Sequence, residues 1–228
     1  MSKQNLIIGL VVILLAACGY YYSVGNFNTA GEAKTKDLEK FSFFITSKNK
    51  GDGGNFGGLA GADAYCQQLA ESVGSKKIWA AYLSGIDGNG EVVDAIGRIG
   101  DGPWYNIYGS LIAEDPEILH SESNLNKQTA LDENGNTVFG RGDERNDHDI
   151  LTGSNDDGTA STTNIMGTTC ENWTAATGSS AIVGHHDRIG RDESAPMKSW
   201  VTSHSSRGCS LPQLRSTGGA GLIYCFAK

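Results

Sequence analysis

The stretch Gly57-Gly58-Leu59-Ala60-Gly61-Ala62-Asp63-Ala64-Tyr65-Cys66-Gln67 opens the clearest helical pattern in the chain. Over residues 59–73, apolar side chains recur at helical spacing along one face, which predicts a helix that packs against a core. Asp63 is expected in its first turn, where a negative charge suits the helix dipole. Gly74 is typical of a helix end. The pattern places Cys66 on the buried face, where it is available for a disulfide bond.

Cys66 is one of four cysteines in the polar, glycine-rich part of the chain, together with Cys170, Cys209 and Cys225. Four cysteines allow three pairings. A nested arrangement would join Cys66 to Cys225 and Cys170 to Cys209, so that the early helix is tied to the last apolar run. Spacing alone leaves the other pairings open.

The fifth cysteine, Cys18, ends an apolar run near the N-terminus. Residues 6–17 are too few to span a hydrocarbon core of about 30 Å and suit the apolar region of a signal peptide. The ending Leu15-Ala16-Ala17-Cys18 resembles the lipobox of bacterial lipoproteins, which implies a signal peptide over 1–18 and a lipid anchor on Cys18. Gly19 after the cysteine resembles an outer-membrane address. The alternative is an uncleaved anchor extended by three tyrosines, and both versions export the rest of the chain.

The remaining sequence predicts a polar tether over residues 19–40 and one folded domain over 41–228. An apolar fraction of 39% and 31 glycines in 228 residues indicate many turns, and hence an α+β domain with short strands, one main helix and long loops. Strands are expected at residues 41–46, 78–84, 199–202 and 221–226, and a polar, mostly loop region at 140–167. The net charge of −8 argues against nucleic acid as a partner.

Several segments, taken together and in order, resemble the endostatin-like domains of bacterial surface lipoproteins, including those of leptospires. Besides residues 57–67, they are Trp79-Ala80-Ala81-Tyr82-Leu83-Ser84, Thr152-Gly153-Ser154-Asn155-Asp156-Asp157-Gly158, Thr169-Cys170-Glu171-Asn172-Trp173 and Leu222-Ile223-Tyr224-Cys225-Phe226. The resemblance implies a C-type-lectin-like fold with two nested disulfides, Cys66–Cys225 and Cys170–Cys209. It also implies non-catalytic binding, because several members of the family bind host laminin, plasminogen or complement regulators.

The chain departs from its relatives in the residues that bind their ligands. Vertebrate endostatin binds zinc through histidines at the N-terminus of its domain, and residues 41–49 here contain none. Sugar-binding C-type lectins hold calcium with Glu-Pro-Asn or Gln-Pro-Asp, whereas this chain has Glu114-Asp115-Pro116. An acidic chain also gives no support for endostatin's heparin-binding arginine surface. Fold therefore transfers more readily than function.

Five residues are candidate ligand contacts. Trp104 lies between Pro103 and Tyr105 in a glycine-rich turn and is expected to be exposed, whereas Trp79 and Trp173 are expected in the core. The other four candidates lie in the polar 140–167 region and are Arg141, Asp143, Asp156 and Asp157.

Two of these candidates, Arg141 and Asp143, flank Gly142 in the tripeptide that integrins recognise, although three-residue motifs often arise by chance. The acidic residues of the region suggest a structural calcium ion as an alternative to a simple solvated loop. No EF-hand loop fits the spacing.

We expect no other metal and no enzyme. His185 and His186 are adjacent, and adjacent side chains usually point in different directions, while His120, His148 and His204 are dispersed. Zinc-ligand spacings and the glycine-flanked serine of hydrolases are both missing. The sequence thus predicts a membrane-anchored, non-catalytic binding or adhesion lipoprotein of the outer membrane that recognises a protein or glycan. The alternative is a structural envelope protein that binds another component of the same cell.

Overall fold

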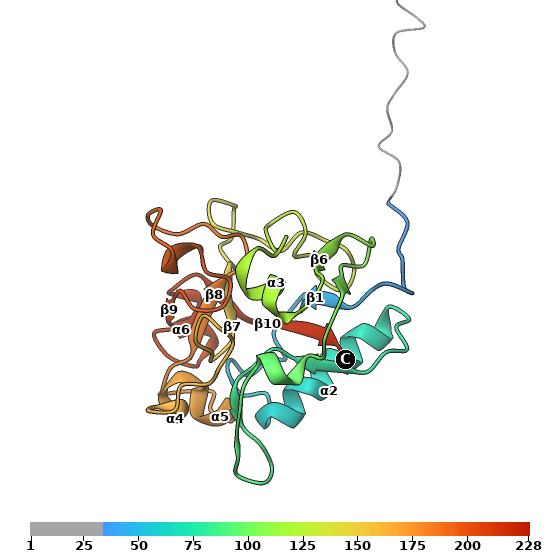
Figure 1. Cartoon of the computed structure of the whole chain (residues 1–228). Coiled ribbons are helices and arrows are strands. Elements are labelled where there is room, and N and C mark those ends of the chain that lie inside the picture. Colours follow the sequence, from blue (N-terminus) through green and yellow to red (C-terminus); the bar gives the residue numbers. More distant parts are fainter. Residues whose placement is uncertain (1–33) are drawn as a thin grey trace, which may run out of the picture. The chain divides into compact units, whose positions relative to one another are not determined.

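Strand β10 (Gly219–Ala227) is the centre around which this computed structural model is built (Figure 1). The structure describes residues 34–228, and Lys36–Lys228 form one compact unit. The second half of β10 pairs antiparallel with β1 (Phe43–Ile45) and β2 (Trp79–Ala81). Its first half pairs parallel with β7 (Asp149–Leu151). Because β10 has neighbours on both edges and both faces, its apolar run is continuous rather than alternating.

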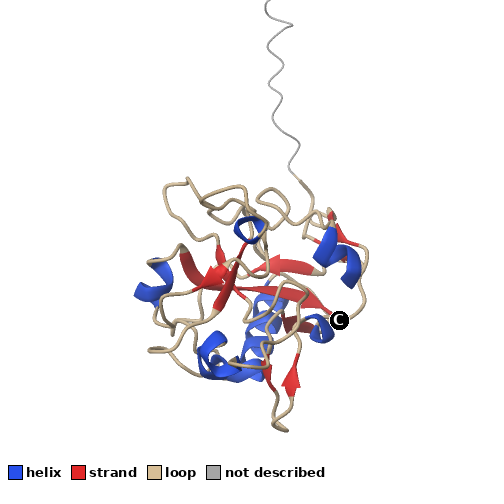
Figure 2. Cartoon of the chain, turned by 60° about the vertical axis from the view of Figure 1, so that its left-hand side comes forward, coloured by secondary structure: helices blue, strands red, loops and turns tan. Residues whose placement is uncertain are grey.

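The sheet continues from β7 to β8 (Ile182–His185) and then to β9 (His204–Ser205), all antiparallel. The remaining strands of the described residues form two separate hairpins. One pairs β3 (Gly85–Ile86) with β4 (Val92–Val93), and the other pairs β5 (Trp104–Tyr105) with β6 (Leu111–Ala113). Figure 2 shows the strands in the middle of the domain and the helices around them. The α+β class predicted from the sequence is confirmed.

The helices are α2 (Gly58–Ser72), α3 (Pro116–Ser121), α4 (Ile165–Thr168), α5 (Cys170–Trp173) and α6 (Leu211–Arg215), with 3-10 turns η1 (Ile96–Arg98) and η2 (Pro196–Lys198). Helix α2 confirms the main predicted helix, and Cys66 is buried on its inner face. Asp63 was wrongly expected in the first turn, because the helix begins at Gly58. Its carboxylate instead accepts hydrogen bonds from the Ala81 amide at 2.9 Å and the Arg98 guanidinium at 2.7 Å, which joins α2 to β2.

Both nested disulfides are present. Cys66 of α2 is bonded to Cys225 of β10, 159 residues later, and Cys170 of α5 is bonded to Cys209, 39 residues later. Cys66–Cys225 fixes the main helix on the central strand, as the nested pairing predicted.

The prediction that Trp104 is exposed is wrong, because this residue is only 1% exposed. Its indole nitrogen donates to the Ala227 carbonyl oxygen at 3.2 Å, and its ring centroid lies 5.3 Å from that of Phe226. The turn-like composition of this segment correctly indicates that the neighbouring Pro103 is exposed. The β5–β6 hairpin, however, places the Trp104 ring on the core side. Trp79 and Trp173 are buried, as predicted.

The strand predicted at residues 199–202 is also wrong. Residues 199–202 form no strand, although Trp200 and Val201 are buried. This segment passes close to β8, and the Trp200 carbonyl oxygen would lie 1.9 Å from a β-carbon at Gly184. The 140–167 region is mostly loop, as predicted, although it contains β7 and buried residues on both sides of that strand.

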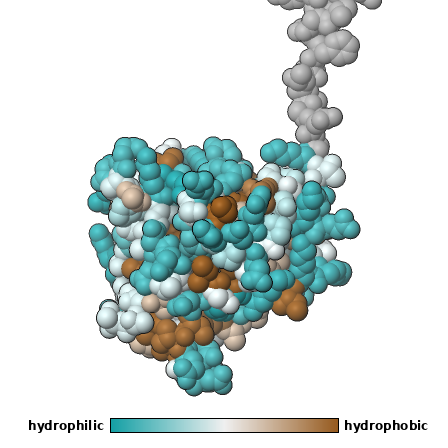
Figure 3. All heavy atoms as spheres, viewed as in Figure 1, coloured by the Kyte–Doolittle hydropathy of each residue, from teal (hydrophilic) through white to brown (hydrophobic). Residues whose placement is uncertain are grey.

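The N-terminal predictions fall largely outside the described residues, including the signal peptide 1–18, Cys18 and tether residues 19–33. Part of the predicted tether packs on the domain, where the Asp37 amide donates to the Ile107 carbonyl oxygen at 2.8 Å. No helix within residues 34–228 has the length and apolar character needed to cross a membrane. On the face drawn in Figure 3, hydrophobic residues form small groups within a hydrophilic surface.

Candidate metal centre

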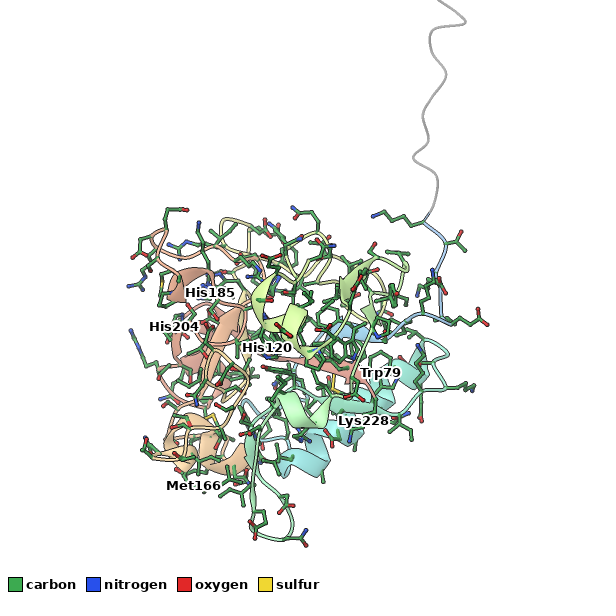
Figure 4. All side chains as sticks on the ribbon, in the orientation of Figure 1. Trp79, His120, Met166, His185, His204 and Lys228 are labelled. Carbon is green, nitrogen blue, oxygen red and sulfur yellow. A yellow bond between two sulfur atoms is a disulfide. The ribbon has the colours of Figure 1, made fainter. Side chains whose placement is uncertain are left out.

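Three neighbouring strands bring three histidines and one aspartate together. His148 precedes β7, Asp149 begins β7, His185 ends β8 and His204 begins β9. Asp149 and His185 are direct cross-strand partners. His204 pairs with Val183, and because side chains alternate along a strand, His204 and His185 share a face. Figure 4 shows His185 and His204 side by side at this edge of the domain.

The three histidines converge on one carboxylate oxygen of Asp149. Asp149 Oδ1 lies 3.1 Å from His148 Nε2, 3.4 Å from His185 Nε2 and 3.5 Å from His204 Nε2. His185 Nε2 and His204 Nε2 are 3.2 Å apart. The rings of His148 and His185 are stacked with centroids 4.1 Å apart. His148, Asp149 and His185 offer ligand atoms that all lie within 4.8 Å of one another.

Each histidine has an acceptor at its other ring nitrogen. Nδ1 of His148 lies 3.2 Å from Asp187 Oδ1, Nδ1 of His185 lies 2.8 Å from the Met197 carbonyl oxygen, and Nδ1 of His204 lies 3.1 Å from the Ser205 carbonyl oxygen. An acceptor at Nδ1 favours the tautomer with its proton there. In the neutral rings, all three Nε2 atoms then present lone pairs to Asp149.

The Asp149 carboxylate is 1% exposed, and neither of its oxygens receives a hydrogen bond of good geometry from the described residues. A buried carboxylate without donors is costly. Lone pairs of three imidazoles pointing at the same oxygen add repulsion. A positive charge at this point, on a protonated imidazole or a metal ion, would stabilise the carboxylate and remove that repulsion.

With protons alone, His148 is the charged group. Burial lowers the pKa of His148, but the carboxylates of Asp149 and Asp187 outweigh burial and raise it to about 9. Burial raises the pKa of Asp149, but the three histidines hold it far below its usual range. Asp149 also raises the pKa of His204. With His148 protonated and both carboxylates ionised, the cluster keeps a net negative charge.

Two glycines of the neighbouring segment make room for this cluster. A β-carbon at Gly218 would lie 3.0 Å from His148 Nε2, and one at Gly219 would lie 3.1 Å from the Asp149 β-carbon. Gly218 also has a φ of +116°, which disfavours any other residue. The glycines let the ends of β7 and β10 approach without displacing the ligand atoms.

The residues singled out from the sequence lie elsewhere, with one exception. Asp143 is held by the Lys127 ammonium at 2.6 Å and the Gly140 amide at 2.7 Å. Asp156 accepts from the Ser199 hydroxyl at 2.6 Å, and Asp157 from Thr159. These carboxylates thus have separate partners and do not gather around a common centre, so the calcium alternative gains no support. Arg141 is the exception, since it lines a cavity beside the histidines.

The expectation of no metal overlooked this cluster. Its argument about adjacent histidines holds for His186, which is buried away from the site with Nε2 3.2 Å from the Phe139 carbonyl oxygen. His185 meets histidines from other strands instead. The sequence contained one usable signal, the adjacent His148 and Asp149 at the start of an apolar run, but it did not show which strand would lie beside them.

No family model matches this chain, and no curated protein matches it.

Proposed function

We propose that this domain binds one divalent transition-metal ion, with zinc as the physiological ion, through His148, Asp149 and His185, and with His204 as the fourth ligand. The observation that carries the proposal is the convergence of three Nε2 atoms on a buried carboxylate that receives no well-aligned hydrogen bond from the described residues.

The spacing suits zinc. Ligand atoms at about 2.0–2.1 Å from a tetrahedral ion lie roughly 3.3 Å from one another. The contacts of Asp149 Oδ1 with the three nitrogens span 3.1–3.5 Å, and the His185–His204 nitrogen contact is 3.2 Å. Imidazole ligands favour zinc and its neighbours, whereas calcium takes six to eight oxygens.

The surroundings also suit a metal. Ligating histidines commonly donate their second ring N–H to a carboxylate or a backbone carbonyl, which orients the ring. Asp187 supplies the carboxylate for His148, and carbonyl groups serve His185 and His204. Four protein ligands are typical of a structural zinc site, so the metal is assigned to holding the domain together and the chain to a non-catalytic role.

The test is metal content at equilibrium. Purified domain dialysed against buffered zinc should retain one zinc per chain by mass spectrometry. His185→Gln and Asp149→Asn should lose it, whereas His120→Gln should retain it, because His120 lies outside the cluster and contacts the Tyr82 hydroxyl at 2.7 Å. Equal zinc content in all four proteins would refute the site.

We further propose that the metal-bound domain is the exported part of an outer-membrane lipoprotein anchored at Cys18, with an endostatin-like, C-type-lectin-like fold that binds a protein or glycan. The α+β architecture and the two nested disulfides support this assignment. The intact mass of membrane-extracted protein tests the anchor, since acylation at Cys18 predicts a chain that begins there and carries acyl groups. A full-length chain without acyl groups would refute it.

A further inference from the structure

A cavity of about 290 Å³ lies directly over the metal ligands. His148, His185 and His204 form part of its wall, and Arg141 and Arg191 form another part. The side chain of His204 is 30% exposed, so the cavity connects the ligand cluster with solvent. It is small for a drug-sized ligand, since such sites usually span about 300–1,000 Å³.

The two arginines have no carboxylate partner. No acidic oxygen of the described residues lies within 4.0 Å of either guanidinium group, whereas Arg98 and Arg145 each have an aspartate partner. Both Arg141 and Arg191 are exposed overall and line the cavity. Arg207 and Arg215 also have no carboxylate partner within the described residues, so what distinguishes Arg141 and Arg191 is that both line the same small cavity. Two guanidinium groups at one cavity, in a chain of net charge −8, suit an anion.

The tripeptide Arg141-Gly142-Asp143, the motif that integrins recognise, has contacts that are compatible with an anion site at this cavity. Its Asp143 is held by Lys127 and by the Gly140 amide, and the Arg141 amide donates to the Asp187 carboxylate. The loop is therefore fixed by its own contacts on the side of Asp143, and Arg141 lines the cavity. The same Asp187 that holds this loop also orients His148, which links the arginine to the metal ligands.

We propose that the cavity binds an oxyanion, the carboxylate or phosphate group of a small molecule, between Arg141 and Arg191 and against the positive charge of the metal. This inference rests on the proposed metal centre for part of its affinity. Guanidinium groups match both oxyanions through paired N–H donors. A divalent ion would cancel the negative charges of Asp149 and Asp187, which leaves the two guanidinium groups as the uncompensated charge at the cavity.

The experiment is a titration of the domain with inorganic phosphate, and separately with acetate, followed by the NMR signals of the arginine Nε–H groups. It is run on metal-free and on zinc-loaded protein. We expect saturable shifts of Arg141 and Arg191 in both forms and affinity at least tenfold higher in the zinc-loaded form. The acetate and phosphate titrations show which oxyanion is preferred.

Three variants make the result specific. Arg141→Gln and Arg191→Gln should each weaken binding by about tenfold, the typical effect of one charge-assisted hydrogen bond. Arg207→Gln, an exposed arginine that does not line the cavity, should leave the affinity unchanged. The arginines are exposed, so these changes should not unfold the domain.

The outcomes separate the two proposals. If zinc binds but neither anion gives saturable shifts, or if all three variants behave alike, the oxyanion site is wrong and the metal centre stands. If zinc does not bind, the metal centre is wrong, and the titration of the metal-free protein decides the oxyanion site by itself. Equal affinity with and without bound zinc would overturn the part of the inference that rests on the metal.

Discussion

Zinc should raise the thermal stability of the domain, and replacing one ligand should abolish the increase. The four ligands come from β7, β8, β9 and the residue before β7, so they meet only in the folded state. An ion that binds only the folded state stabilises it by about 2.7 kcal/mol at a free concentration of 100 times Kd. For a unit the size of Lys36–Lys228, 1 kcal/mol shifts Tm by about 2–4 °C. The expected increase is therefore about 5–11 °C.

The assay is scanning calorimetry of the disulfide-bonded domain in buffered zinc and in a chelator. His185→Gln should melt at the same temperature in both. His120→Gln is the matched control, since it removes a part-buried histidine with a hydrogen bond of its own, and it should keep the full zinc response. Magnesium, which prefers oxygen ligands, should have no effect. An undiminished zinc response in His185→Gln would refute the reasoning.

Four further outcomes are expected. Trp104→Ala should lower the free energy of unfolding in urea by about 3–5 kcal/mol, because the ring is fully buried; a surface tryptophan would lose almost none. Removing the Cys170–Cys209 bridge by a double alanine change should cost about 4 kcal/mol on the chain-entropy estimate for a 39-residue loop, and an unchanged denaturation midpoint would contradict that. Gly218→Ala should weaken zinc binding measured by calorimetric titration, because its β-carbon would crowd His148 Nε2; unchanged affinity would show that the segment yields. Zinc affinity should fall by about tenfold or more between pH 7.5 and 5.5, since protons compete for imidazole nitrogens, and a flat profile would exclude histidine ligands.

The main helix could be predicted because its apolar pattern is local. The disulfide pairing could be predicted because the cysteines allow few alternatives. The apolar stripe of α2 extends over four turns, and it identifies Cys66 as buried without any knowledge of its partner. Four cysteines leave only three pairings, and the resemblance selects one of them. The error at Trp104 has the opposite origin. Its neighbours have turn composition, and only the β5–β6 pairing shows on which side of the hairpin its ring lies.

The candidate metal centre could not be predicted from local patterns, because its residues come from three segments separated by 36 and 19 positions and belong to very short strands. β9 has two residues and β8 has four, which is too short for a periodic pattern to reveal register. The pairing of Asp149 with His185 depends on that register, since a shift by one residue would direct His186 toward Asp149 instead. Aspartate at the start of an apolar run is ordinary in a sequence, and only burial without a donor makes it informative.

A proton alone satisfies only part of this cluster. Protonated His148 lies between Asp149 and Asp187 and suits both carboxylates, yet His185 and His204 still face the same Asp149 oxygen with their Nε2 atoms. A single divalent ion could be coordinated by all four side chains at once. It would also complete the cross-linking of the fold. Neither disulfide includes a residue of β7, β8 or β9, so these strands are joined to one another by short hydrogen-bonded ladders and by the histidine–aspartate cluster. We infer that the ion cross-links β7, β8 and β9, the strands in which neither disulfide has a residue. It would lie beneath the cavity that Arg141 and Arg191 line.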